Sequence, residues 1–398
     1  MTTSTKRSLT AAGVALAALA LAACGSGGGS ASSSSAPAPT SSSAPAPTSS
    51  SAPAPTPAEL AAAIVEPLKA PITWPAPTPL TMPVDVKGKT IWWIPIGDAV
   101  PVIHGFYVGF TQGVEAAGGS VKLCDGKFNP QEIGNCLTQA GDQNADAVVT
   151  AFIDYAMLPA AFDALVAKGI PVLIAGVPPT GGKTNSPELS FFDPSAHVNA
   201  MYETNSAAGI LAGGDAPNGL WLRLLDSSLT TNASDAGVAK WTALCPDCPL
   251  ATVDYTTANV DKLASAVSAA LVANPGINVI MVPVDSFVPP VSQAVQTAGA
   301  NVKIVSTGGD LPNMQNVTAG VQAGDLGTPV IFTGWQYANA LFQLLVGDQV
   351  IPDSGLTNRY FDQGNVGDLQ LTPEAYLTNA WYGDDSYAAA FKAAWGVS

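Results

Sequence analysis

From residue 88 the sequence alternates between apolar runs of strand length and amphipathic runs of helical length, and this alternation limits the possible folds. Residues 90–96 and 147–153 are strand-length apolar runs, whereas residues 106–117 carry apolar side chains on one helical face and end at two glycines. Helices that alternate with strands in this way cover both faces of a parallel sheet. The pattern therefore predicts an α/β fold.

The same alternation returns after a polar break at residues 176–190, so we expect two Rossmann-like lobes with parallel sheets. Strands of the second lobe are expected at residues 220–225, 250–255, 278–284, 302–306 and 328–332. Lobe one is predicted to span residues 88–182, with residues 334–350 returning to it, and lobe two to span residues 183–333. Crossovers that form a hinge are expected near residues 176–190, 306–311 and 332–336.

The first 24 residues have the pattern of an export signal. Lys6 and Arg7 precede an apolar stretch of 13 residues, 9–21, which is shorter than the ~20 residues that a membrane-spanning helix needs. The stretch leads to Leu-Ala-Ala-Cys, which resembles the lipobox of bacterial lipoproteins, where cleavage precedes a lipidated cysteine. We expect a signal peptide at residues 1–23 and a lipid anchor on Cys24, at the extracytoplasmic face of the cell membrane. The alternative is an ordinary signal peptide with a chance cysteine.

A tether follows the predicted anchor at residues 24–57. Residues 33–56 contain three copies of the sequence SSSAPAPT, which offers no apolar face to bury. Residues 58–87 are predicted to form a short helix and a proline-rich lead-in, and residues 351–398 form a C-terminal extension. The tether should hold the folded lobes away from the membrane.

Composition argues against several functional classes. Acidic side chains outnumber basic ones by 30 to 15 and no basic run occurs, so nucleic acid is not an expected partner. His104 and His197 are the two histidines of the sequence, which leaves little for a histidine-based metal site. The sequence contains no HExxH motif, and no GxSxG motif occurs outside the tether. We therefore predict no metal, no cofactor and no catalytic residue.

Four cysteines follow Cys24, and an even number in an exported protein favours disulfides. The plausible pairs are Cys124 with Cys136 and Cys245 with Cys248, although the spacing alone leaves the pairing open. Cys245 and Cys248 also form a CxxC motif, so a thiol-disulfide activity is an alternative. Reactive CxxC motifs start a helix, whereas this one follows a predicted helix. A zinc site formed by all four cysteines is a further alternative, but it would require the cysteine pairs of the two lobes to lie next to each other.

The lipobox, the tether and the two lobes together resemble the type I periplasmic binding proteins, the solute receptors of bacterial ABC importers, and most closely their sugar-binding branch. The sequences that carry the resemblance lie at residues 88–131, 145–176, 279–299, 303–310 and 327–348. The resemblance implies a monomer without enzymatic activity that binds a sugar or polyol between its lobes. It also implies an ABC permease and its ATPase as partners.

Ligands of parallel sheets bind beyond the carboxyl ends of the strands. The ligand-binding residues expected there are Asp98, Phe106, Asp154 and Tyr155 in lobe one, Asp226, Asp285 and Asp310 in lobe two, and Trp335 at the return crossover. A carboxylate accepts several hydrogen bonds from hydroxyl or amine donors, and an aromatic ring packs on the apolar face of a sugar. The alternative for each aspartate is a capping role in the next turn.

The predicted pocket loops contain no arginine, although the sugar-binding relatives usually bring one or two to the ligand. The nearest candidates are Arg223, inside a strand, and Arg359, in the extension. This departure favours a neutral ligand. The function that we expect is therefore capture of a small neutral sugar- or polyol-like solute for import. The alternatives are an extracytoplasmic enzyme, either a thiol-disulfide enzyme or a carboxylate-based glycosidase, and a receptor for a membrane signalling partner.

Overall fold

The computed structural model describes residues 54–351 and 355–397. The predicted signal peptide, the lipidation of Cys24 and the tether as far as residue 53 lie outside the described residues. In the described part of the chain, no helix combines the length and the apolar character that a membrane span requires.

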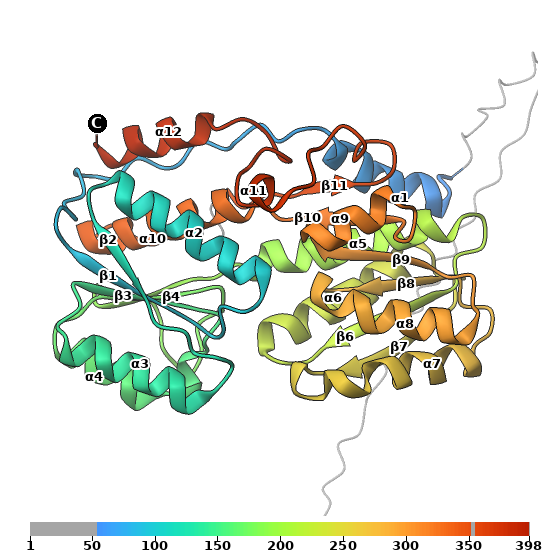
Figure 1. Ribbon diagram of the computed structural model, residues 1–398, viewed down its shortest axis with the longest axis horizontal. Coiled ribbons are helices and arrows are strands. Elements are labelled where there is room, and N and C mark those ends of the chain that lie inside the picture. Colours follow the sequence, from blue (N-terminus) through green and yellow to red (C-terminus); the bar gives the residue numbers. More distant parts are fainter. Residues whose placement is uncertain (1–53, 352–354, 398) are drawn as a thin grey trace, which may run out of the picture. The chain divides into compact units, whose positions relative to one another are not determined.

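The first sheet has five parallel strands in the order β2-β1-β3-β4-β5 and forms the centre of lobe one (Figure 1). The strands are β1 (Thr90–Pro95), β2 (Ser120–Leu123), β3 (Ala147–Ala151), β4 (Val172–Ala175) and β5 (Leu189–Phe192). The helices between them are α2 (Pro101–Ala116), α3 (Pro130–Asp142), η2 (Tyr155–Met157) and α4 (Pro159–Ala167). Successive β1 side chains alternate between two cores, because strand side chains point to opposite faces: Trp93 packs with α2, and Trp92 packs with α3.

The second sheet has six strands in the order β11-β10-β9-β8-β6-β7, parallel except for β11, and forms the centre of lobe two. The strands are β6 (Gly219–Leu224), β7 (Leu250–Tyr255), β8 (Val279–Val282), β9 (Lys303–Gly308), β10 (Gly324–Gly327) and β11 (Arg359–Phe361). The helices are α5 (Ser195–Gly213), α6 (Ser228–Leu244), η3 (Thr257–Lys262), α7 (Leu263–Ala273), η4 (Asp285–Phe287), α8 (Val288–Ala298) and α9 (Leu311–Thr318). The two sheets confirm the predicted α/β fold with two lobes.

The boundary between the lobes differs from the prediction. Strand β5 lies in parallel register with β4, so lobe one continues to residue 192 and the chain crosses to lobe two just before α5. The predicted boundary after residue 182 is therefore about ten residues too early. A four-residue strand after a polar loop is too short for periodicity to reveal.

The return crossover also differs from the prediction. The strand expected at residues 328–332 is β10 at residues 324–327, and α10 (Val330–Val346) begins directly after it. Helix α10 packs on α2 of lobe one, and glycines allow this close approach: a Cβ on Gly109 would lie 2.2 Å from the carbonyl oxygen of Ile331. A short apolar run fits a strand or a buried helix equally well, so the sequence pattern alone did not separate them. Residues 306–311, expected as a crossover, remain within lobe two.

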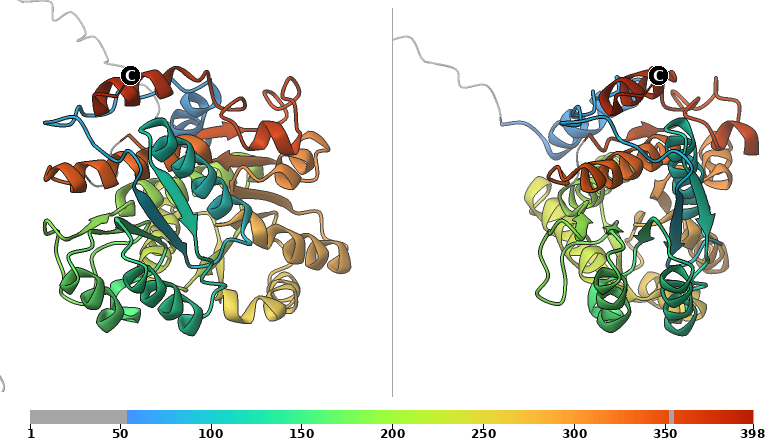
Figure 2. Two further views of the ribbon diagram at one scale, coloured as in Figure 1. Left: turned by 60° about the vertical axis from the view of Figure 1, so that its left-hand side comes forward. Right: turned by 90° about the vertical axis from the view of Figure 1, so that its left-hand side faces the viewer.

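The segments at the two ends of the described chain pack together. Helix α1 (Pro57–Val65), which begins at a capping box of Thr56 and Glu59, packs on α5 of lobe two and continues into η1 (Glu66–Lys69). The lead-in then runs along the C-terminal extension, where Leu80 and Val84 donate backbone hydrogen bonds to residues near the end of the chain (Figure 2). The extension contributes β11 to the second sheet, and its helices are α11 (Pro373–Tyr376) and α12 (Ser386–Trp395).

Both predicted cysteine pairs are disulfides in the structure. Cys124 and Cys136 link the end of β2 to α3, and Cys245 and Cys248 close a short turn between α6 and β7.

Candidate functional site

Two aspartates at the carboxyl edge of the first sheet keep a free acceptor. Asp98 follows β1 and Asp154 follows β3, and in each the buried Oδ1 has no hydrogen-bond partner among the described residues. The other oxygen of Asp98 lies 2.9 Å from Nδ1 of His104, on the first turn of α2. Burial raises the pKa of Asp154. A buried acceptor without a partner loses solvation, so both aspartates can gain from a donor that a ligand supplies.

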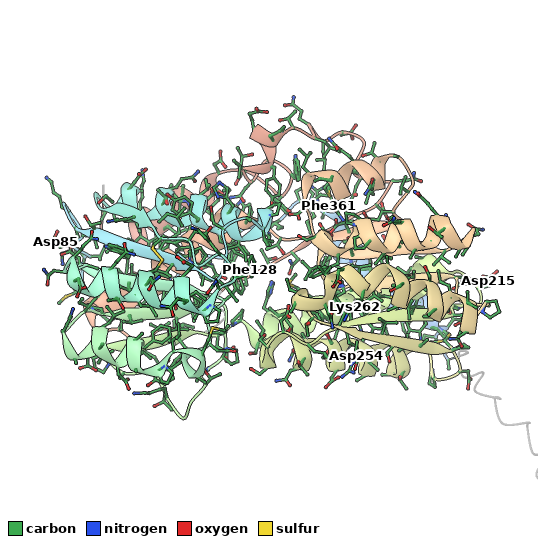
Figure 3. The ribbon with its side chains drawn as sticks, turned by 60° about the horizontal axis from the view of Figure 1, so that its bottom comes forward. Asp85, Phe128, Asp215, Asp254, Lys262 and Phe361 are labelled. Carbon is green, nitrogen blue, oxygen red and sulfur yellow. A yellow bond between two sulfur atoms is a disulfide. The ribbon has the colours of Figure 1, made fainter. Side chains whose placement is uncertain are left out.

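The loop after β2 places an aromatic ring at the same edge, which the sequence analysis did not anticipate. Phe128, labelled in Figure 3, is 44% exposed. Its ring lies over Gly97, the residue before Asp98. Lys127 and Phe128 both have left-handed backbone angles, with φ of 50° and 54°. The sequence does show an aromatic residue in a polar loop between a predicted strand and a predicted helix. Whether Phe128 is exposed, however, depends on this left-handed backbone, which the sequence does not reveal.

A second unusual backbone lies beside Asp154. Phe152, directly after β3, has a φ of 62°, an uncommon conformation for a bulky residue that costs free energy. Its ring packs against Gly176, which follows β4 and has no space for a Cβ. Strained backbone therefore occurs after both β2 and β3, at the edge where the sheet topology predicts a ligand.

The three aromatic residues that were expected to contact a sugar are buried in the structure. Phe106 is buried in the core between Phe152 and Tyr337, and Trp335 stacks on Trp395 with 5.3 Å between ring centroids. Tyr155 is buried, and its hydroxyl donates to Asp163 on α4. Burial and these contacts show that Phe106 and Trp335 pack helices on the first sheet, whereas Tyr155, next to Asp154, is buried at the end of η2 nearest β3.

In lobe two, Asp226 and Asp285 bind the protein's own donors. Asp226 is exposed at the end of β6 and accepts hydrogen bonds from the backbone N–H and the hydroxyl of Thr257. Asp285 is fully buried and accepts one bond from the hydroxyl of Ser306 and one from the backbone N–H of Asp310. This geometry favours the capping interpretation for both residues.

Asp310 belongs to a buried acidic cluster with Asp285 and Asp325. It is 5% exposed, and its Oδ1 accepts a hydrogen bond of 2.9 Å from the hydroxyl of Tyr376 in the C-terminal extension. Burial, with the charge of Asp285 nearby, raises the pKa of Asp310 to about 7. Burial likewise raises the pKa of Asp325 well above its usual value, and its Oδ2 has no hydrogen-bond partner in the described part of the chain. The extension therefore covers the second-lobe aspartate that was expected to meet the ligand.

Neither arginine of the described residues is available to a ligand at the strand ends. Arg223 pairs with Asp235 and Asp254, and Arg359 donates to the backbone carbonyls of Lys69 and Trp381. Across residues 54–351 and 355–397, no three potential ligand side chains gather as a metal site would require. The site thus has acceptors and apolar rings but no arginine.

The CxxC motif does not have the arrangement of a redox centre. Cys245 directly follows the last residue of α6, so no helix N-terminus lies beside it to lower a thiol pKa.

A surface cavity of about 690 Å³ lies at the opposite edge of the second sheet. Lys303, at the start of β9, and Ala323, just before β10, line it together with residues of the extension. It is remote in topology from the strand ends described above and is not part of the candidate site.

No protein-family model matches the chain, and no curated protein matches it. Solved structures do resemble it. One is an ABC transporter solute-binding protein from Agrobacterium vitis with bound allitol, at 19% identity and a TM-score of 0.59, covering 71% of this chain and 98% of that chain. A second protein from Agrobacterium vitis, bound with alpha-D-tagatopyranose, is 18% identical with a TM-score of 0.62, covering 74% and 100%.

The Caulobacter myo-inositol binding protein, bound to myo-inositol, is 18% identical with a TM-score of 0.59, covering 73% of this chain and 98% of that chain. Two parallel-stranded lobes joined by several crossovers define a class of two-lobed α/β binding folds. Within that class, the fold of this chain is that of the type I periplasmic binding proteins, as the resemblance in the sequence implied.

Proposed function

We propose that this protein is an extracytoplasmic solute-binding lipoprotein that captures a small neutral ligand of the sugar or polyol class between its lobes. The proposal includes delivery of the ligand to an ABC permease and its ATPase. The observation that carries it is the carboxyl edge of the first sheet, where Asp98 and Asp154 each hold a buried carboxyl oxygen without a partner among the described residues and Phe128 is exposed in the loop after β2. Three of the similar structures hold allitol, alpha-D-tagatopyranose and myo-inositol.

The chemistry of this edge favours hydroxyl-rich neutral ligands. Carboxylate oxygens accept hydrogen bonds from hydroxyl groups, and a phenyl ring packs on C–H groups. An anionic ligand would meet carboxylates without an arginine to pair with, because Arg223 and Arg359 are bound elsewhere in the protein. The alternative of a thiol-disulfide enzyme lacks support, since Cys245 and Cys248 lie after a helix and not at its start.

The two-lobed architecture supports capture by closure. Ligand contacts from both lobes favour a closed state, and a membrane partner can recognise that state. Asp154 is our candidate contact from lobe one and Asp310 from lobe two. Because Tyr376 now bonds Asp310, closure on a ligand includes a rearrangement of this hydrogen bond.

Titration calorimetry with allitol, tagatose and myo-inositol tests the proposal, with citrate as an anionic control. The expected result is 1:1 binding of at least one neutral compound and none of citrate, together with a smaller radius of gyration in solution scattering. Binding of citrate alone, or binding without compaction, would contradict the proposed function.

A further inference from the structure

The loop between β2 and α3 is fixed at both ends and in its middle. Cys124 is bonded to Cys136 of α3, and the side chain of Asn129 caps the first turn of that helix. In the middle, the backbone N–H of Gly126 donates to the carbonyl of Pro95, and that of Phe128 donates to the carbonyl of Ile96 at 2.6 Å. The loop is therefore held against the end of β1.

Side-chain bonds strengthen the same arrangement. One oxygen of Asp125 accepts backbone N–H bonds from Asp98 and from Lys127, each at 2.9 Å. These bonds, with the disulfide, offset the free-energy cost of the left-handed backbone at Lys127 and Phe128. They fix in place the aromatic residue Phe128, which remains 44% exposed.

The Phe128 ring can pack on residue 97 only because that residue is glycine. A Cβ on Gly97 would lie 2.2 Å from the Phe128 ring, so any side chain there would displace it. One face of the ring covers Gly97, and the next residue is Asp98, whose Oδ2 lies 2.9 Å from Nδ1 of His104 and whose Oδ1 is buried without a partner among the described residues. A flat apolar surface and a hydrogen-bond acceptor thus lie side by side at the edge of lobe one that Figure 3 shows nearer to lobe two.

We propose that Phe128 is the stacking platform of the ligand site and that it selects cyclic ligands with a continuous C–H face over acyclic polyols. This inference rests on the proposed function and adds the ligand subclass. A six-membered ring presents several C–H groups in one plane to an aromatic face while its equatorial hydroxyls reach an acceptor beside it. An acyclic polyol must be ordered before it presents such a face, which lowers its affinity.

Calorimetry with myo-inositol and allitol, on wild type and three variants, tests the platform. Phe128→Ala should weaken myo-inositol binding by about 10- to 100-fold and allitol binding by much less, so the preference for the ring falls. Phe128→Leu keeps an apolar side chain without a flat face and should lose about 3- to 10-fold for myo-inositol. Val272→Ala, which shortens an exposed apolar side chain on α7, is the matched control and should change neither affinity.

The outcomes separate the two proposals. If wild type binds myo-inositol and Phe128→Ala binds it equally well, the platform is wrong and the proposed function stands. If wild type binds allitol more tightly than myo-inositol, the selection of cyclic ligands is wrong. If wild type binds neither compound nor any other neutral sugar, the proposed function fails and the platform fails with it.

Discussion

The buried carboxyl of Asp310 should make the protein less stable as the pH rises. Its pKa is raised from 3.8 to about 7, so the folded state holds a proton that the unfolded state releases between these values. The contribution of Asp310 to stability therefore falls as the pH rises from about 4 to 7 and is constant above that. One pKa unit corresponds to about 1.4 kcal/mol, so the full effect is about 4 kcal/mol, of which about 2 kcal/mol falls between pH 5.5 and 8.

Asp310→Asn removes this ionisation and keeps the local geometry. The amide oxygen can still accept the hydrogen bond from Tyr376, and the backbone N–H can still donate to Asp285. The variant should be more stable than wild type at pH 8, and its advantage should be about 2 kcal/mol larger at pH 8 than at pH 5.5. The groups that face Asp310 are Asp285, Asp325, Tyr376 and Tyr382.

Urea unfolding followed by tryptophan fluorescence at both pH values measures this difference. Burial lowers the pKa of His197 to about 4, which makes acidification destabilising between about 6.5 and 4, but this contribution is the same in both proteins and cancels. Asp368→Asn, at an exposed position of the extension, is the control and should match wild type. Parallel pH profiles for wild type and Asp310→Asn would refute the reasoning.

Four further predictions follow from the site and its supports. Asp154→Ala should weaken binding of the best neutral ligand by about 10- to 100-fold in calorimetry while the melting temperature stays near that of wild type; unchanged affinity would make it only a turn residue. Gly97→Ala should displace the Phe128 ring and weaken myo-inositol binding about as much as Phe128→Ala does. Wild-type affinity for myo-inositol in this variant would refute the packing of the ring on Gly97 as a requirement for binding. Replacing Cys124 and Cys136 by serine should lower the unfolding free energy by about 2–4 kcal/mol in urea; a loss of less than 1 kcal/mol would show that the bond is not structural. A chain that begins at Ala54 should bind the ligand as tightly as the full chain, and a tenfold loss would assign the preceding residues a role in binding.

Much of the fold could be predicted because hydrophobic periodicity reflects burial. Runs such as residues 90–96 and 147–153 are almost entirely apolar because both faces of a parallel sheet are covered. The prediction was wrong where an element was short or its periodicity ambiguous: β5 has four residues after a polar loop, and residues 328–332 begin a buried helix.

The candidate site was less predictable because the partners of each aspartate lie far away in the sequence. Asp226 and Asp285 have their donors in Thr257 and Ser306, and Asp310 meets Tyr376, 66 residues later. No local pattern distinguishes such a capping carboxylate from one that is free. The sheet edge followed from topology, whereas the roles of its side chains depended on tertiary contacts.

The aromatic residues illustrate the same limit. Phe106 was predicted to contact the ligand, although it shares an apolar helical face with Phe110 and Val114, and that face is buried in the core of lobe one. Phe128 lies in a loop without periodicity, and its exposure follows from a left-handed backbone that the surrounding bonds impose.

Native mass spectrometry of the protein isolated from its own host tests the central claim most directly. The account predicts one neutral sugar or polyol bound per chain in wild type, with much lower occupancy in Asp154→Ala prepared in the same way. An anionic or cofactor-like molecule in the complex, or equal occupancy in the variant, would contradict it.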